Sequence, residues 1–309
     1  MSTARVRTAA VDAAERRGGW RPDTDRRMAL FESPVRDVLE PAIDALAAAD
    51  RITLVPDAHY PFHPSSGMVT DPAVIGAIVA WLEGRTDADI AVAGASDERI
   101  SFDRTVQYLG YESLLEGFDA DAVDLADEPR TGDLSALGDA PVALSVPNRL
   151  AEGAVIVVPS LRATAAGPVA GAMRTLADLV DCDAASDRAA VAATRTVDPA
   201  VAVLDATTAY AGDPVAGDTL FAGSAPAVDA VATSLLGRSL ESDGALETVR
   251  GDRGPISVEG DADFDRLRER MPDGELPPAD DTHPAVSTAY RVYAAVAGDA
   301  VPPQLEGGR

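Results

Sequence analysis

The 309-residue sequence has one cysteine, no lysine, few aromatic residues and no long apolar run. A single cysteine, Cys182, cannot form a disulfide framework, and by itself it cannot hold an iron–sulfur cluster. The longest apolar runs, such as 154–160, are far shorter than the roughly 20 residues that span a bilayer. The N-terminus has no continuous apolar core of the kind that marks a signal peptide. We therefore expect a soluble, cytoplasmic protein without an iron–sulfur cluster.

The charged residues are strongly unbalanced. The 26 basic residues are all arginine, whereas 51 residues are acidic, which gives a formal net charge of −25. Duplex nucleic acid and anionic membranes would be repelled by such a surface, so we expect neither as a partner. A dense carboxylate shell without lysine suits a salt-rich cell interior, where screening reduces self-repulsion. We interpret the composition as adaptation to the cytoplasm of an extreme halophile. A GC-rich genome is the alternative explanation for the missing lysine.

The pattern of apolar residues divides the chain into three parts. Residues 1–50 are expected to be helical, because Val35, Leu39, Ile43 and Leu46 recur at helical spacing. Residues 51–270 alternate short β-branched runs with helical stretches and are expected to form an α/β domain. Residues 271–309 begin with a segment rich in proline and acid, which indicates a linker, and could end in a helix.

The middle part predicts an α/β fold with a mainly parallel sheet and helices on both faces. Its apolar runs are near-continuous and are separated by amphipathic segments, as expected for strands buried on two sides. Ligands of such sheets bind at the carboxyl ends of the strands. The expected strands are 52–55, 90–93, 123–125, 142–146, 155–158, 201–204 and 220–222, and the expected helices are 71–83, 102–115, 168–180 and 226–236.

The loop after the first of these strands contains Asp57, His59 and His63. One oxygen and two nitrogen ligands within seven residues could bind a divalent metal such as zinc, iron or manganese, or supply acid–base chemistry. The spacing is not that of a known metal motif. The alternative is that both histidines pack against Tyr60 and Phe62 and shape the wall of a pocket.

The same loop continues through Ser65 and Ser66 to a helix start. Hydroxyl groups and free backbone N–H groups at that point could hold an anionic ligand. Thr70 or Asp71 can serve as the N-cap, and Pro72 suits the first turn of the helix. No phosphate-binding glycine motif is present, so the pattern does not indicate a nucleotide.

Two arginines follow a later strand. Arg162 lies in the loop after it, and Arg174 lies on the next helix, so both could clamp a carboxylate or phosphate. If so, Arg174→Ala would weaken anion binding and leave the fold intact. The alternative is that the two arginines offset nearby acids, and an internal ion pair of Arg174 would then most naturally involve Asp178.

Two aspartates occupy notable positions further along the chain. Asp205 ends a strand, where it could contact a ligand. Asp229 lies within the apolar face of the next helix, where a carboxylate needs a partner or its pKa rises. Asp229 could therefore be a general base, or a structural acid that bonds a neighbouring loop.

Read in order, these stretches resemble the domain-of-unknown-function 362 family. That family has a strand ending in Lys-Pro-Asn and a helix opened by Thr-Asp-Pro, which here are 55–57 and 70–72. Its later segments are similar to AVAGAS, QYLGYESL, VVPSLR, Arg174-Thr175 and VLDATTAYAGDPVAG, and to the Ala-Val-Asp-Ala sequence at 227–230. The resemblance covers about residues 50–260 and implies a fold and a site rather than a particular reaction.

The departures from the family pattern bear on chemistry. Two family lysines stand here as Arg162 and Arg174, which keeps the charge, whereas a third is Val55. Asparagine is replaced by Asp57 in one motif and by Thr175 in another. Many relatives carry ferredoxin-like cysteine runs, and this chain has none, so the resemblance does not imply iron–sulfur electron transfer.

These observations favour an enzyme that acts on a small anionic metabolite in a cleft formed by strand-end loops. A non-catalytic ligand-binding or accessory protein on the same scaffold is the alternative. We expect one cleft to gather the candidate residues, which are Asp57, His59, His63, Arg162, Arg174, Asp205 and Asp229.

Overall fold

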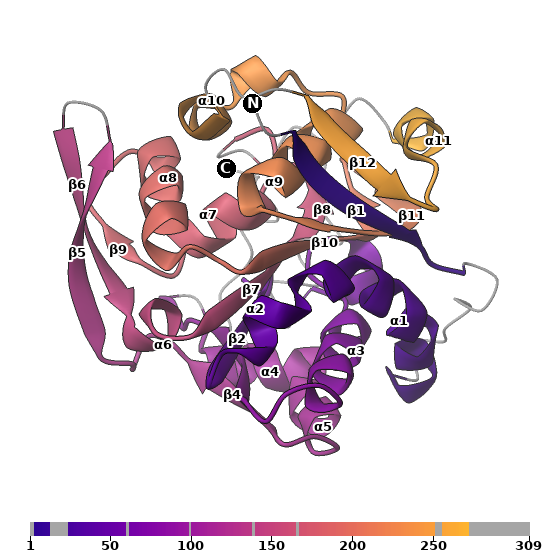
Figure 1. Cartoon of the computed structure of the whole chain (residues 1–309), viewed down its shortest axis with the longest axis horizontal. Helices are drawn as coiled ribbons and strands as arrows, with labels where there is room; N and C mark the ends of the chain where they lie inside the picture. The colour runs from indigo at the N-terminus through magenta and orange to yellow at the C-terminus, as the bar shows by residue number, and fades with distance from the viewer. Residues whose placement is uncertain are drawn as a thin grey trace, which may run out of the picture.

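The computed structural model describes residues 3–12, 24–59, 62–98, 100–137, 140–164, 167–250 and 255–271. Within these ranges, nine strands form one large mixed sheet, three more form a small antiparallel sheet, and helices cover both faces of the large one (Figure 1). The predicted α/β class with a mainly parallel sheet is therefore confirmed. The predicted linker and last helix, apart from Met271, lie outside the described residues.

Five parallel strands form the centre of the large sheet. Their spatial order is β4–β3–β2–β7–β10, so the chain builds outward from β2 to β4 and then returns to the other side of β2 with β7. This reversal of direction between β2 and β7 is the topological switch point at which doubly wound sheets bind ligands. The strands are β2 (Arg51–Pro56), β3 (Asp89–Gly94), β4 (Ala120–Asp124), β7 (Ala154–Val158) and β10 (Val201–Tyr210).

Antiparallel pairing extends the sheet beyond β10. There β11 (Pro214–Gly223) pairs with β10, β1 (Ala4–Ala10) pairs with β11, and β12 (Ile256–Gly260) pairs in parallel with β1. The short strand β8 (Ser160–Arg162) also pairs with β10. The prediction that residues 1–50 are helical is wrong for β1, whose buried Val6 and Thr8 alternate with exposed arginines as in a strand.

The two faces of the sheet carry two separate hydrophobic cores. Ile52 and Leu54 of β2 pack toward one core, and Val55 packs toward the other, because successive strand residues point to opposite faces. The helices of the first core are α1 (Thr24–Leu39), α2 (Ile43–Ala47), α3 (Pro72–Glu83), α4 (Phe102–Leu109) and α5 (Tyr111–Leu115). Those of the second are α7 (Gly171–Ala177), α8 (Ser186–Val197), α9 (Ala225–Leu235), α10 (Gly244–Arg250) and α11 (Phe264–Arg270).

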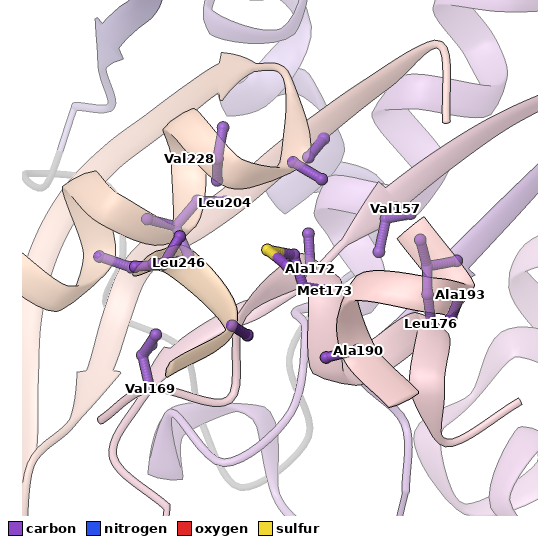
Figure 2. Packing of buried hydrophobic residues seen from close by; sticks show 14 of the residues in the cluster. Val157, Val169, Ala172, Met173, Leu176, Ala190, Ala193, Leu204, Val228 and Leu246 are labelled. Carbon is purple, nitrogen blue, oxygen red and sulfur yellow. The ribbon is translucent and has the colours of Figure 1, made fainter. Parts of the chain in front are cut away.

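The second core brings helices from distant parts of the chain onto β7 and β10. Met173 and Leu176 of α7 lie between Val157 of β7 and side chains of α8, α9 and α10 (Figure 2). Many of the α8 contacts are alanines, such as Ala190 and Ala193, so the helix approaches its neighbours closely. The position of α7 is therefore set by tight packing, and α7 borders the site described below.

Local sequence signals explain the ends of two helices. Asp71 is the N-cap of α3, since its carboxylate accepts a hydrogen bond of 3.0 Å from the backbone N–H of Ala73, and Pro72 follows in the first turn. The predicted helix 102–115 is divided into α4 and α5 by Gly110, which has a φ of 80°. A left-handed residue ends an α-helix, and glycine adopts this conformation without a Cβ penalty.

A small sheet lies beside the main one. It consists of β5 (Arg130–Leu137), β6 (Ala140–Pro147) and β9 (Asp181–Cys182), with α8 packed against β5 and β6 and the short helix α6 (Asn148–Ala151) following β6. Single turns of 3-10 helix occur at 40–42, 64–66 and 240–242. None of the helices in the described ranges is long and apolar enough to cross a membrane.

Candidate functional site

A pocket of about 450 Å³ opens at the carboxyl ends of the parallel strands. Its walls come from the segments after β2, β3 and β7 and from α7, so it lies at the switch point between β2 and β7. The volume falls within the range of small-ligand sites. The lining residues are Val55, Pro56, Asp57, Ala58, His59, Gly94, Ala95, Ser96, Asp97, Arg162, Thr164, Thr175, Asp178 and Leu179.

Asp57 is the buried acid of this pocket, with 3% of its surface exposed. Its backbone N–H donates to the carbonyl of Val158 (3.0 Å), which continues the β2–β7 pairing by one residue. Its backbone carbonyl accepts a hydrogen bond of 2.9 Å from the N–H of Thr70, just before α3. The backbone of Asp57 is thus held from two sides, and the side chain is directed to the strand ends.

Three side chains donate hydrogen bonds to the Asp57 carboxylate. Oδ1 lies 2.8 Å from Nδ1 of His59, and Oδ2 lies 2.8 Å from Oγ of Ser160 and 2.6 Å from Nε of Arg162. Burial by itself would raise the pKa of Asp57, but the charges and hydrogen bonds of Arg162 and His59 outweigh it and hold the pKa well below its usual range. The carboxylate is therefore ionised at any physiological pH.

The ionised state of Asp57 determines the tautomer of His59. A carboxylate can only accept hydrogen bonds, so Nδ1 of His59 must carry the hydrogen in this contact. In the neutral ring, Nε2 then has the free lone pair and can accept a proton. The side chain of His59 is 34% exposed and lines the pocket, so a small ligand can approach the ring.

Arg162 also faces the pocket, with 12% of its side chain exposed. Nε and Nη2 donate to the two oxygens of Asp57, at 2.6 and 3.3 Å. As far as the structure describes the chain, the other terminal nitrogen, Nη1, forms no hydrogen bond within the protein. The guanidinium is thus fixed along one edge and has donors available along another.

Asp178, which also lines the pocket, was not among the candidate site residues. It directly follows α7, and its side chain is exposed at the rim, yet the surrounding protein removes part of its hydration. This desolvation and the negative charge of Asp57 raise the pKa of Asp178, although Arg162 and His59 counteract them. Asp178 was predicted only as an ion-pair partner of Arg174, because the two residues are four positions apart on a helix. That spacing does not indicate that Asp178 borders a pocket at the strand ends.

His63, Ser65 and Ser66 lie on the following turn and do not line the pocket. Nδ1 of His63 lies 2.7 Å from Oγ of Ser65, and Oγ of Ser66 accepts from the N–H of Met68. Across the described residues, no three histidine, cysteine or acidic side chains are grouped so that they could hold a metal ion. The predicted ligand set of Asp57, His59 and His63 is therefore not assembled, because His63 bonds to its own turn.

Arg174 does not line the pocket and instead forms a buried ion pair. Its terminal nitrogens contact both oxygens of Asp243 at 2.8 and 3.1 Å, and Nη2 also contacts Asp187 at 2.7 Å. These acids raise the pKa of Arg174 against the opposing effect of burial. The expectation that Arg174 contacts a ligand in the shared cleft is therefore wrong, and its partners are Asp243 and Asp187 rather than Asp178.

The other two aspartates of the expected cleft also have structural partners. Oδ2 of Asp205 accepts a hydrogen bond of 2.8 Å from the N–H of Asp71, which ties β10 to the start of α3. The Asp229 carboxylate accepts from the N–H groups of Ala172 and Met173, at 2.6 and 2.9 Å. Asp229 is thus the structural acid of the two alternatives, and it binds the first turn of α7. The pocket gathers only Asp57, His59 and Arg162 of the seven expected residues.

Asp229 predicts a pH dependence of stability. Burial raises its pKa to about 7, despite the two backbone N–H groups that favour the ionised form. The unfolded carboxyl ionises near pH 4, so the folded state binds the extra proton between about pH 4 and 7. Stability from this group should therefore be present at acid pH and fall by up to about 4 kcal/mol as the pH rises to 7.

Chemical unfolding of wild type and Asp229→Asn across pH 4–7 measures this effect. Asparagine cannot ionise, so the free energy of unfolding of the wild type should decline relative to the variant as the pH rises. Parallel curves would mean that the carboxyl is already ionised in the fold, and the backbone N–H groups and Arg174 would then control its charge.

The fold and the pocket define a doubly wound α/β protein with a polar ligand-sized site at its topological switch point. The family model described as "Domain of unknown function (DUF362)" matches residues 52–234, and the chain belongs to this family. The match contains β2, β3, β7 and α7, which supply the walls of the pocket. A search of curated proteins gave no match.

Proposed function

We propose that the protein is an enzyme that removes a proton from a carbon next to a carboxylate or carbonyl group of a small metabolite. The observation that carries this proposal is the arrangement around Asp57, whose buried carboxylate binds His59 and Arg162 at the edge of one pocket. His59 would act as the general base, Asp57 would orient it, and Arg162 would bind the oxygen that gains negative charge.

The role of His59 follows from its contact with Asp57. The hydrogen bond at Nδ1 fixes the ring and leaves Nε2 to accept the proton, as a general base requires. When the C–H bond breaks, its proton moves to Nε2 and its electron pair moves toward the adjacent oxygen. Asp57 then stabilises the imidazolium, because the buried carboxylate remains ionised.

The role of Arg162 follows from its free donors. A guanidinium held on one side by Asp57 cannot rotate away, and Nη1 can donate to a carboxylate or carbonyl oxygen in the pocket. Such a preorganised donor is most effective where negative charge develops during a reaction. The anion expected from sequence would thus be bound by one arginine rather than by the pair of Arg162 and Arg174.

The positions of the family motifs also favour this pocket. Val55, Asp57, Arg162 and Thr175 stand where the sequence resembles the family's lysine and asparagine motifs, and all four line the pocket. Residues distant in sequence but related by these motifs therefore meet at one place. Motif residues that serve only packing are not expected to line the same solvent-accessible cavity.

Deuterium exchange tests the proposal without knowledge of the product. The protein is incubated in D₂O with a panel of hydroxy, keto and amino acids, and each compound is analysed by mass spectrometry. Deuterium should enter the carbon next to the carboxylate or carbonyl of at least one compound. His59→Gln should slow that exchange by about 10²- to 10⁴-fold, the usual contribution of a general base.

His63→Gln is the matched control. It removes the other histidine of the same segment, which bonds to Ser65 outside the pocket, and should leave exchange unchanged. Equal rates for wild type and His59→Gln would refute the assignment of the base. Binding of panel compounds without exchange or turnover would instead support a non-catalytic ligand-binding protein on this scaffold.

A further inference from the structure

Two side chains of opposite charge line the pocket. Arg162 contributes a guanidinium with free donors on the β7 side, and Asp178 contributes a carboxylate at the end of α7. The two side chains line the same pocket but form no ion pair with each other; the carboxylate that pairs with Arg162 is Asp57. The pocket thus has a cationic contact point and a separate anionic one.

Asp178 forms no ion pair through its carboxylate within the part of the chain that the structure describes. Its backbone N–H bonds the carbonyl of Arg174 within α7, but its side chain forms no hydrogen bond or ion pair with any residue that the structure describes. Desolvation by the surrounding protein and the nearby charge of Asp57 raise the pKa of Asp178, so both act against its ionised form. A positively charged group of a ligand would relieve both effects.

From this arrangement we propose that the pocket binds a small zwitterion, a compound that carries a carboxylate and an ammonium group, as amino acids do. The carboxylate contacts Nη1 of Arg162, and the ammonium group contacts Asp178. This inference rests on the proposed function for the role of Arg162 and adds the substrate class. The ammonium group would also offset the repulsion between the ligand carboxylate and a protein of net charge −25.

Matched ligands isolate the contribution of the ammonium group. Calorimetric titrations compare alanine with propionate, aspartate with succinate, and 4-aminobutyrate with butyrate, at the lowest KCl concentration that retains the fold. In each pair the compounds differ chiefly in the amino group. For at least one pair, wild type should bind the amino acid about tenfold or more tightly, as expected for a hydrogen bond between charged groups.

Asp178→Asn is the decisive variant, because it keeps the shape of the side chain and removes its charge. The preference for the amino acid should fall to near unity, while the affinity for the simple carboxylate should remain equal or increase. Asp183→Asn, which changes an exposed acid outside the pocket, is the control and should preserve the preference.

The outcomes separate this inference from the proposed function. Equal affinity of wild type for both members of every pair, or an unchanged preference in Asp178→Asn, overturns the zwitterion. Deuterium exchange that depends on His59 would still stand in that case. No binding of any pair to wild type also overturns the zwitterion, whereas a preference lost only in Asp178→Asn supports it even if no exchange is found.

Discussion

Replacement of Arg174 by methionine is expected to lower the free energy of unfolding by about 3–5 kcal/mol. Asp243 is fully buried and accepts two hydrogen bonds from Arg174, so the substitution leaves an unpaired charge inside the protein. Methionine keeps most of the apolar stem, and the loss therefore reports mainly on the ion pair. Urea unfolding in about 2 M KCl, where the acidic surface is screened, measures the change.

Two further variants make this result interpretable. Arg36→Met removes an arginine from an exposed contact with Asp37 and should change stability by less than about 1 kcal/mol. The double variant Arg174→Met with Asp243→Asn should be more stable than the sum of the single changes predicts, because neither partner is then left as an uncompensated charge. A loss below about 1 kcal/mol in Arg174→Met would show that the pair contributes little.

Salt should have the second large effect. At a net charge of −25, the carboxylates of the unscreened surface repel each other, and the folded state keeps them closer together than the unfolded chain does. The Debye length falls from about 10 Å at 0.1 M to about 3 Å at 1 M salt. We expect the melting temperature to rise by about 10 °C or more between 0.1 and 3 M KCl, which corresponds to roughly 3 kcal/mol.

A parallel series in sucrose serves as the comparison for this experiment. Sucrose stabilises folded proteins by exclusion from their surface but does not screen charge. The rise in KCl should therefore exceed that in sucrose of equal osmolality and should be steepest at the low end, where the Debye length changes most. A melting temperature that is constant across the KCl series would contradict a salt requirement based on charge repulsion.

Local patterns were enough to predict the parallel part of the fold. The apolar runs of β2, β3 and β7, and the Thr70-Asp71-Pro72 start of α3, are each determined by neighbouring residues. Helix α8 and strand β1 were missed although signals exist. The apolar face of α8 consists largely of alanine, which weakens its periodicity, and β1 has two arginines among its seven residues, which interrupt the apolar run.

The candidate site was harder to predict because charge partners are distant in sequence. Asp57 and Arg162 were identified as strand-end residues, and that reasoning also gave their common location. The same reasoning failed for Arg174, whose partner Asp243 is 69 residues away, and for Asp205, which bonds the N–H of a residue 134 positions earlier. A strand-end position indicates which edge a residue occupies, but packing decides whether its side chain meets solvent or another element.

The pairing of β1 with β12 has a consequence for the order in which the fold can form. The N–H of Ala10 donates to Oδ1 of Asp261, 251 residues later, and in Figure 1 the indigo and orange strands lie side by side. Contacts of such sequence separation carry a high loop-closure cost and form late. During synthesis, β1 therefore leaves the ribosome long before its partners β11 and β12 exist, and the family-matched strands β2, β3 and β7 can associate without it. We therefore expect this edge of the sheet to be completed last, after the strands that surround the pocket are in place.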